Sequence, residues 1–148
     1  MMDMAVWQEY LKLLDNLGNT LEKLTEIERS KTAAVSGGNL HGVEECMKQE
    51  QVISLSLRGM DQKREKMLAQ LGLTGVPLRE LEARGPRETH METRRTVEAL
   101  RRKYDVFRSA SEVARNTLEC NLHAIEQVQK AKDAPPLEDQ PRQADFRA

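Results

Sequence analysis

The sequence predicts an all-α protein, an elongated antiparallel three-helix bundle made of a coiled-coil-like hairpin with a long third helix. Charged residues make up 32% of the chain and aromatic residues only 3%, a balance that favours helices over a sheet sandwich. Apolar residues recur at alternating steps of three and four along three long segments, which no strand produces. The 148 residues therefore predict one helical domain over residues 1–131, followed by a disordered tail over residues 132–148.

The first predicted helix covers residues 4–35, and its apolar stripe consists of Trp7, Tyr10, Leu14, Leu17, Leu21 and Leu24. Ser36-Gly37-Gly38-Asn39 ends it, because Gly supplies a left-handed cap and Asn39 can cap the next helix. So short a break predicts that the second helix turns back antiparallel.

The second predicted helix covers residues 40–71 and presents the stripe Val43, Cys46, Glu50, Ile53, Leu57, Met60, Arg64, Met67 and Leu71. Gly72 follows as the expected C-terminal cap, with Leu73 folding onto the last turn. Pro77 and Gly85 then bound a short helical turn over residues 77–83.

The third predicted helix covers residues 89–131, because Thr89 and Glu92 have capping-box spacing; a start at Pro86 is the alternative. Its stripe keeps the three-four spacing throughout: Val97, Leu100, Tyr104, Phe107, Ser111, Ala114, Leu118, Asn121, Ile125 and Val128. Prolines and charges fill the tail, which predicts disorder. Whether Phe146 in that tail has a role stays open.

Residue chemistry gives no reason to expect an enzyme, a metal or a cofactor. His41, His90 and His123 lie far apart, and no phosphate-binding loop or nucleophile motif occurs. Cys46 and Cys120 lie far apart within helical patterns, and a disulfide framework would need more cysteines, so both are expected to be reduced thiols of a cytoplasmic protein. The N-terminus also lacks the pattern of a secretory signal. A net charge of −1, with Glu interleaved among the basic residues of segment 84–103, argues against nucleic-acid binding.

Polar residues interrupt the stripes at Glu28, Lys31, Glu50 and Arg64. One interpretation places them at the edges of the seams, with long stems reaching water. The other makes them partly buried charges that fix the helix register.

The third helix is longer than the other two, and this mismatch predicts a binding surface. If it begins beside the end of the second helix, its last 11 residues or so project roughly 16 Å past the Ser36–Asn39 turn. Leaving an apolar stripe in water costs roughly 1.5–3 kcal/mol per large side chain. We therefore predict that a partner binds Leu118, Asn121, Leu122, Ile125 and Val128. The alternative is a helix that shifts or ends early, so that these residues pack within the chain.

Residues 4–130 resemble the FlgN family. In the second helix the resemblance is carried by Gly38-Asn39-Leu40, Lys48-Gln49-Glu50, Leu57, Arg64, Leu68 and Leu71-Gly72. In the last helix it is carried by Asn116 and Asn121-Leu122; Cys46, Met60 and Met67 stand where aliphatic residues are commoner in the family, and Thr117-Leu118 where it has two leucines.

The resemblance implies a cytosolic flagellar type III export chaperone. Such a protein binds C-terminal helical segments of hook-filament junction proteins (a class of hook-associated proteins), prevents their early assembly and presents them to the export-gate protein. No nucleic acid or small-molecule substrate is expected. The alternative function is a structural or adaptor coiled coil that self-associates, as a homodimer, through the same stripe.

Overall fold

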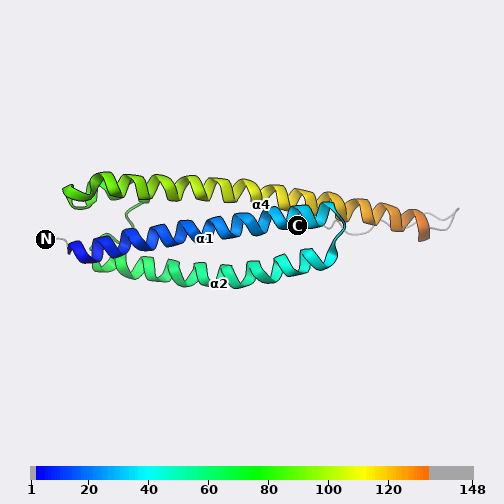
Figure 1. Cartoon of the computed structure of the whole chain (residues 1–148), viewed down its shortest axis with the longest axis horizontal. Helices are drawn as coiled ribbons and strands as arrows, with labels where there is room; N and C mark the ends of the chain where they lie inside the picture. Colours follow the sequence, from blue (N-terminus) through cyan, green and yellow to red (C-terminus); the bar gives the residue numbers. More distant parts are fainter. Residues whose placement is uncertain (1–2, 134–148) are drawn as a thin grey trace.

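The computed structural model describes residues 3–133, with side chains described for residues 3–123. Three long helices form an elongated bundle (Figure 1): α1 (Met4–Ser36), α2 (Leu40–Gln70) and α4 (His90–Asp133). The connection between α2 and α4 contains η1 (Leu78–Glu80), α3 (Leu81–Arg84) and η2 (Arg87–Thr89). The predicted all-α bundle with a long last helix is confirmed.

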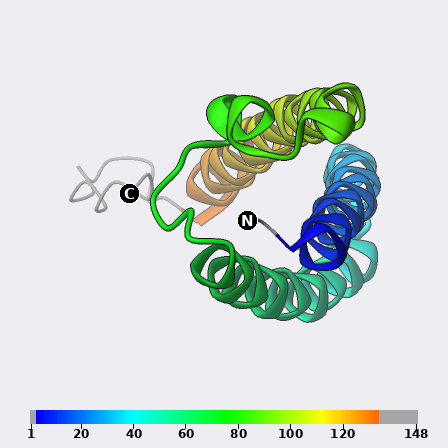
Figure 2. The same cartoon turned by 90° about the vertical axis from the view of Figure 1, so that its left-hand side faces the viewer.

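The helix α1 lies between the other two long helices. It packs against both α2 and α4, whereas α2 and α4 hardly contact each other. Seen end-on, the three helices form an open arc rather than a closed triangle (Figure 2). Because α1 serves two neighbours, it buries more than its predicted stripe: Leu11 and Leu13 are also buried. A single heptad stripe describes only one of its two apolar faces.

The turn between α1 and α2 has the predicted chemistry. Gly38 adopts a φ of +69°, a conformation that glycine allows without strain. The Asn39 amide donates to the Ala34 carbonyl oxygen over 2.8 Å, and the Asn39 side chain accepts from the Gly42 amide over 2.9 Å. These bonds satisfy groups at both helix ends, so α2 returns antiparallel along α1.

The C-terminal end of α2 also follows the prediction. Gly72 has a φ of +71°, and the Leu73 amide donates to the Leu68 carbonyl oxygen over 2.8 Å. Leu68 and Leu73 are both buried, which gives this cap the apolar contact that usually accompanies it.

The connection from α2 to α4 packs against the N-terminal end of α1. Trp7 and Leu81 are fully buried there, and Trp7 donates through Nε1 to Thr93 Oγ1 over 3.2 Å. A Cβ at Gly85 would lie 2.7 Å from Cη2 of Trp7 and closer still to Cζ2. The indole therefore requires a residue without a side chain at position 85.

The helix α4 begins at His90, close to the predicted start, but its lead-in differs from a simple capping box. A 3-10 turn, η2, follows Pro86, and the Thr89 hydroxyl donates to the Pro86 carbonyl oxygen over 2.7 Å. The carboxylate of Glu92 accepts from Gln8 Nε2 over 3.4 Å, so it bridges to α1. The alternative start at Pro86 thus corresponds to the 3-10 turn that precedes α4, and the α-helix itself begins at His90.

The pairing of α4 with α1 is parallel and in a fixed register. Three side-chain hydrogen bonds link the two helices: Trp7 to Thr93, Gln8 to Glu92, and Lys103 to Asn19. The bonded residues are 86, 84 and 84 positions apart in the sequence. The same separation places Ser36, the last residue of α1, beside residues 120–122 of α4. The remainder of α4 therefore projects roughly 16 Å beyond α1. Figure 1 shows this end of α4 extending past the turn between α1 and α2.

The helix α2 is buried near its two ends and only half-buried in its middle. On α2, Val43 and Cys46 near one end and Met67 and Leu68 near the other are buried. Between them the predicted stripe residues are only half-buried: Glu50, Ile53, Leu57, Met60 and Arg64. Tyr104, in the middle of the α4 stripe, is 51% exposed because α2 does not reach across to cover it.

Candidate functional site

The predicted partner-binding residues, which we call the distal stripe, are Leu118, Asn121, Leu122, Ile125 and Val128. From Ala114 onward, burial decreases along α4: Ala114 is 1% exposed, Leu118 is half-buried and Leu122 is 48% exposed. Ile125 and Val128 lie in α4, but their side chains fall outside the described residues. The exposed fraction increases where α1 comes to its end, which is the place that the helix lengths predict.

Asn121 is turned back onto its own helix. Its Nδ2 donates to the Thr117 carbonyl oxygen over 2.8 Å, and the residue is half-buried. One of its two amide N–H groups is thus engaged within α4 before any partner arrives. Asn121 can therefore offer a partner its oxygen and its second N–H.

A second candidate surface, an apolar hollow that the sequence did not predict, lies at the open middle of the bundle. We call it the waist groove; its volume is about 490 Å³ and it is lined by Leu17, Leu21, Ser54, Leu57, Arg58, Asp61, Arg64, Leu78, Leu100, Arg101 and Tyr104. Two of the half-buried positions of α2, Glu50 and Arg64, are polar residues that interrupt its stripe in the sequence. That α4 fails to meet them is a property of the tertiary packing.

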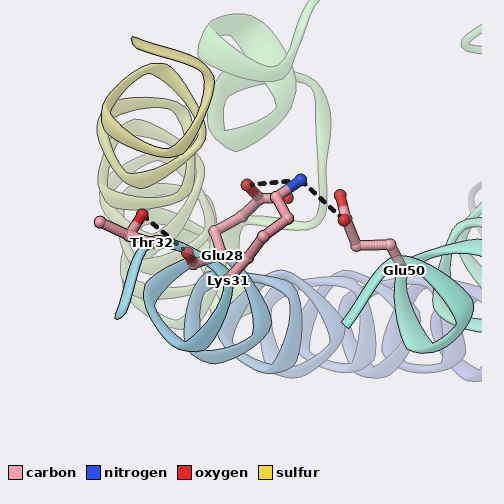
Figure 3. A network of polar contacts seen from close by, with 4 residues as sticks. All are labelled: Glu28, Lys31, Thr32 and Glu50. Atoms are coloured by element: carbon pink, nitrogen blue, oxygen red, sulfur yellow. Dashed lines mark hydrogen bonds and ion pairs between the residues drawn. The ribbon is translucent and has the colours of Figure 1, made fainter. Parts of the chain in front are cut away.

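Three charged residues form a network between α1 and α2, drawn in Figure 3. Lys31 Nζ lies 2.7 Å from Glu50 Oε1 and 3.5 Å from Glu28 Oε2. Glu28 is 3% exposed, and the side chains of Lys31 and Glu50 are 15% and 24% exposed. The interpretation that these residues reach water from the seam edge is therefore wrong for Glu28, which is buried on α1.

The electrostatics of this network are unbalanced because it holds two carboxylates and one ammonium group. Burial and the neighbouring Glu50 raise the pKa of Glu28 to about 7, against an opposing effect of Lys31. The pKa of Lys31 is also raised by its carboxylate partners, although burial acts in the other direction. The network thus holds a carboxyl that takes up a proton near neutral pH.

Arg64 fits the interpretation that places polar stripe residues at the edge of the seam, within reach of water. Its side chain is 26% exposed, and its Nε donates to Asp61 Oδ1 over 3.0 Å. Beneath it, the Tyr10 hydroxyl is buried without a hydrogen-bond partner among the described residues. Burial raises the pKa of Tyr10, and the nearby Arg64 guanidinium opposes that effect.

The remaining chemistry-bearing residues lie apart. Cys46 is buried and Cys120 exposed, both as free thiols. Burial and the Glu50 carboxylate raise the pKa of Cys46, which keeps it protonated. Within the described part of the chain, no group of three or more His, Cys, Asp or Glu side chains could hold a metal ion.

Two residues of the basic segment between residues 84 and 103, Arg94 and Lys103, pair with acidic neighbours. Arg94 donates to both carboxylate oxygens of Glu82, over 2.9 and 2.6 Å. Lys103 lies 3.3 Å from Glu22 of α1. None of the helices in residues 3–133 combines the length and apolar composition that crossing a bilayer requires.

The comparisons with known proteins supply the family. The family model described as FlgN protein matches residues 2–132. No curated protein and no solved structure matches the chain. The matched region contains α1, α2 and all of α4 except its last residue, and it covers far more than half of the 148 residues. The chain therefore belongs to the FlgN family of flagellar export chaperones.

Proposed function

We propose that this chaperone holds the C-terminal amphipathic helices of hook-filament junction proteins on its distal stripe and delivers them to the type III export gate. Its place of action would be the cytoplasm, where the family's members work in general. The observation that carries the proposal is the projection of α4 beyond α1, together with the 48% exposure of Leu122 at that point.

The physical argument rests on unpaired apolar surface. An amphipathic helix of the client would cover Leu118 and Leu122, and the gain from burying each large apolar side chain is roughly 1.5–3 kcal/mol. A client segment that is disordered until bound would gain its helical partner there, in the helix-in-groove mode. The client's own apolar face would be hidden at the same time, which keeps it from assembling early.

The test introduces an aspartate at the distal stripe and, as a comparison, at an exposed leucine elsewhere on the surface. We expect Leu122→Asp and Ile125→Asp to abolish capture of a purified hook-filament junction protein. Leu55→Asp is the matched control, because Leu55 is 65% exposed on α2, away from the distal stripe. Capture is measured by isothermal titration calorimetry, and folding by circular dichroism and thermal melting.

The proposal requires nearly unchanged helicity and melting temperature in both variants. A large loss of helicity would show that these positions belong to the core. Equal capture by Leu122→Asp and Leu55→Asp would place the client elsewhere. The rival, a self-associating coiled coil, predicts a tight dimer in sedimentation at several concentrations, and that dimer would be lost on Leu122→Asp.

A further inference from the structure

The waist groove is a surface separate from the distal stripe. Its α2 wall carries Ser54, Leu57, Arg58, Asp61 and Arg64, which the spacing of the helix places along one face over roughly 15 Å. Its α4 wall carries Leu100, Arg101 and Tyr104, and Leu17 and Leu21 of α1 form the floor. Tyr104 lies some 18 residues before Leu122, so about 27 Å of helix separates the two surfaces.

The shape of the hollow suits a polypeptide better than a small molecule. Small-molecule sites bury 70–90% of their ligand in an enclosed cavity of about 300–1,000 Å³. The waist groove has a comparable volume, about 490 Å³, but it is open to solvent between two helices that hardly contact each other. Such a trough, with an apolar floor and an exposed aromatic at its rim, is the form that accepts an amphipathic helix.

The charges at the rim indicate which helix would fit. Arg58, Arg64 and Arg101 line the groove, and Asp61 is their one acidic neighbour in it. Asp61 pairs with Arg64 at 3.0 Å. Arg58 and Arg101 are exposed and form no ion pair with any residue in the range 3–123. An apolar hollow with two uncompensated guanidinium groups, one on each wall, attracts acidic side chains.

We propose that the waist groove docks an amphipathic helix of another protein, whose apolar stripe is flanked on both sides by Asp or Glu. The stripe lies on Leu17, Leu21 and Leu57, and the flanking carboxylates meet Arg58 on α2 and Arg101 on α4. Since the surface is distinct from the distal stripe, the chaperone can hold this partner and its client together.

The acidic residues that follow α4, Glu138 and Asp139, are poor occupants of the groove on grounds of distance. Tyr104 lies 29 residues before Asp133, or about 43 Å back along the helix. Glu138 and Asp139 come five and six residues after Asp133, and an extended chain of that length spans at most about 22 Å.

The experiment uses two synthetic peptides of about 18 residues, roughly 27 Å as helices. Both carry Leu at positions i, i+3, i+4 and i+7; one has Glu on the flanks and the other Lys. Fluorescence anisotropy with the full chain is expected to show binding of the Glu peptide, weakened by salt, and at least about tenfold weaker binding of the Lys peptide. Equal binding of the two peptides would overturn the proposal.

Variants locate the binding surface. The double variant Arg58→Glu/Arg101→Glu should weaken binding of the Glu peptide at least about tenfold. Arg102→Glu is the matched control, because Arg102 adjoins Arg101 but faces a different hollow, together with Glu22 and Arg29. In the same way, Tyr104→Ala should weaken binding, whereas Val106→Ala, at a residue 46% exposed on the other side of α4, should not.

Two further outcomes would reject the assignment. If Leu122→Asp abolishes binding of the Glu peptide, the peptide occupies the distal stripe and the waist groove is not its site. If the chain forms a dimer in sedimentation that Arg58→Glu/Arg101→Glu dissociates, the occupant is a second copy rather than another protein. Unchanged peptide affinity in Leu122→Asp and a monomer at all concentrations support the proposal.

Discussion

Lys31 on α1 donates to Glu50 on α2 over 2.7 Å, and the same ammonium group lies 3.5 Å from Glu28 (Figure 3). One cation thus serves two carboxylates, and one of these, Glu28, is buried. The network joins the two helices in the half of the bundle from which the end of α4 projects. Its removal therefore tests how firmly that half is held together.

We expect Lys31→Ala to destabilise the protein by roughly 2–3 kcal/mol at pH 8, because it leaves two buried or half-buried carboxylates without their cation. Urea unfolding followed by circular dichroism measures the change. Lys48→Ala is the control, because Lys48 forms a surface ion pair: its side chain is 72% exposed and its Nζ lies 3.6 Å from Oε1 of Glu45. We expect this change to lower the unfolding free energy by less than about 0.5 kcal/mol. Equal effects of the two variants would show that the network contributes nothing beyond a surface ion pair.

The raised pKa of Glu28 predicts a pH dependence with a definite sign. Its pKa in the folded protein is about 7, against an ordinary value of 4.5. The folded state therefore holds this proton more tightly than the unfolded state. The resulting stabilisation is present below pH 4.5 and is lost as the pH rises through 7.

Glu28→Gln should remove that dependence. Relative to the unmodified chain, the variant should gain roughly 2 kcal/mol in unfolding free energy between pH 5 and pH 8. Urea unfolding at the two pH values measures the difference. Glu26→Gln is the control, because Glu26 has a side chain 73% exposed on the same helix. A gain that is the same at both pH values would contradict the assigned pKa.

Gly85→Ala should destabilise the protein by roughly 1–3 kcal/mol, because the new Cβ meets the buried indole of Trp7. Gly59→Ala is the matched comparison: it lies within α2, and nothing is within 4 Å of a Cβ there. The second change should stabilise the helix by about 0.5–1 kcal/mol. Thermal melting separates the two, and a neutral Gly85→Ala would show that the indole can move aside.

Thr93→Val should cost about 1–2 kcal/mol, since it leaves the buried Nε1 of Trp7 without its acceptor. Tyr10→Phe provides the opposite case, because the Tyr10 hydroxyl has no partner among the described residues. Losing that hydroxyl should leave the unfolding free energy unchanged or slightly raise it. Denaturant unfolding of both variants tests the contrast, and a large loss for Tyr10→Phe would reveal a partner such as Arg64.

The sequence predicted the helices and their ends well because these depend on local chemistry. The caps at Asn39 and Gly72 use groups within a few residues of each other, so the residue types predict them directly. The α1 stripe from Trp7 to Leu24 is buried as predicted, since its period of three and four matches a helix. The length difference between α4 and α1 follows from the same counting.

The candidate sites were only partly predictable. Leu122 could be placed at the end of the hairpin from helix lengths alone. The waist groove could not, because Tyr104 and Leu57 both lie on apolar stripes that a closed bundle would have covered. The protein-family match identifies the chaperone class.

Periodicity and capping act within each helix, so the residue types alone predict three long helices, their order, their antiparallel turn and the extra length of the last one. They do not predict that α1 lies between two helices that hardly contact each other, an arrangement of the packed bundle that exposes Tyr104 and buries Glu28. Burial depends on which helices face each other, and an apolar stripe does not specify which element covers it.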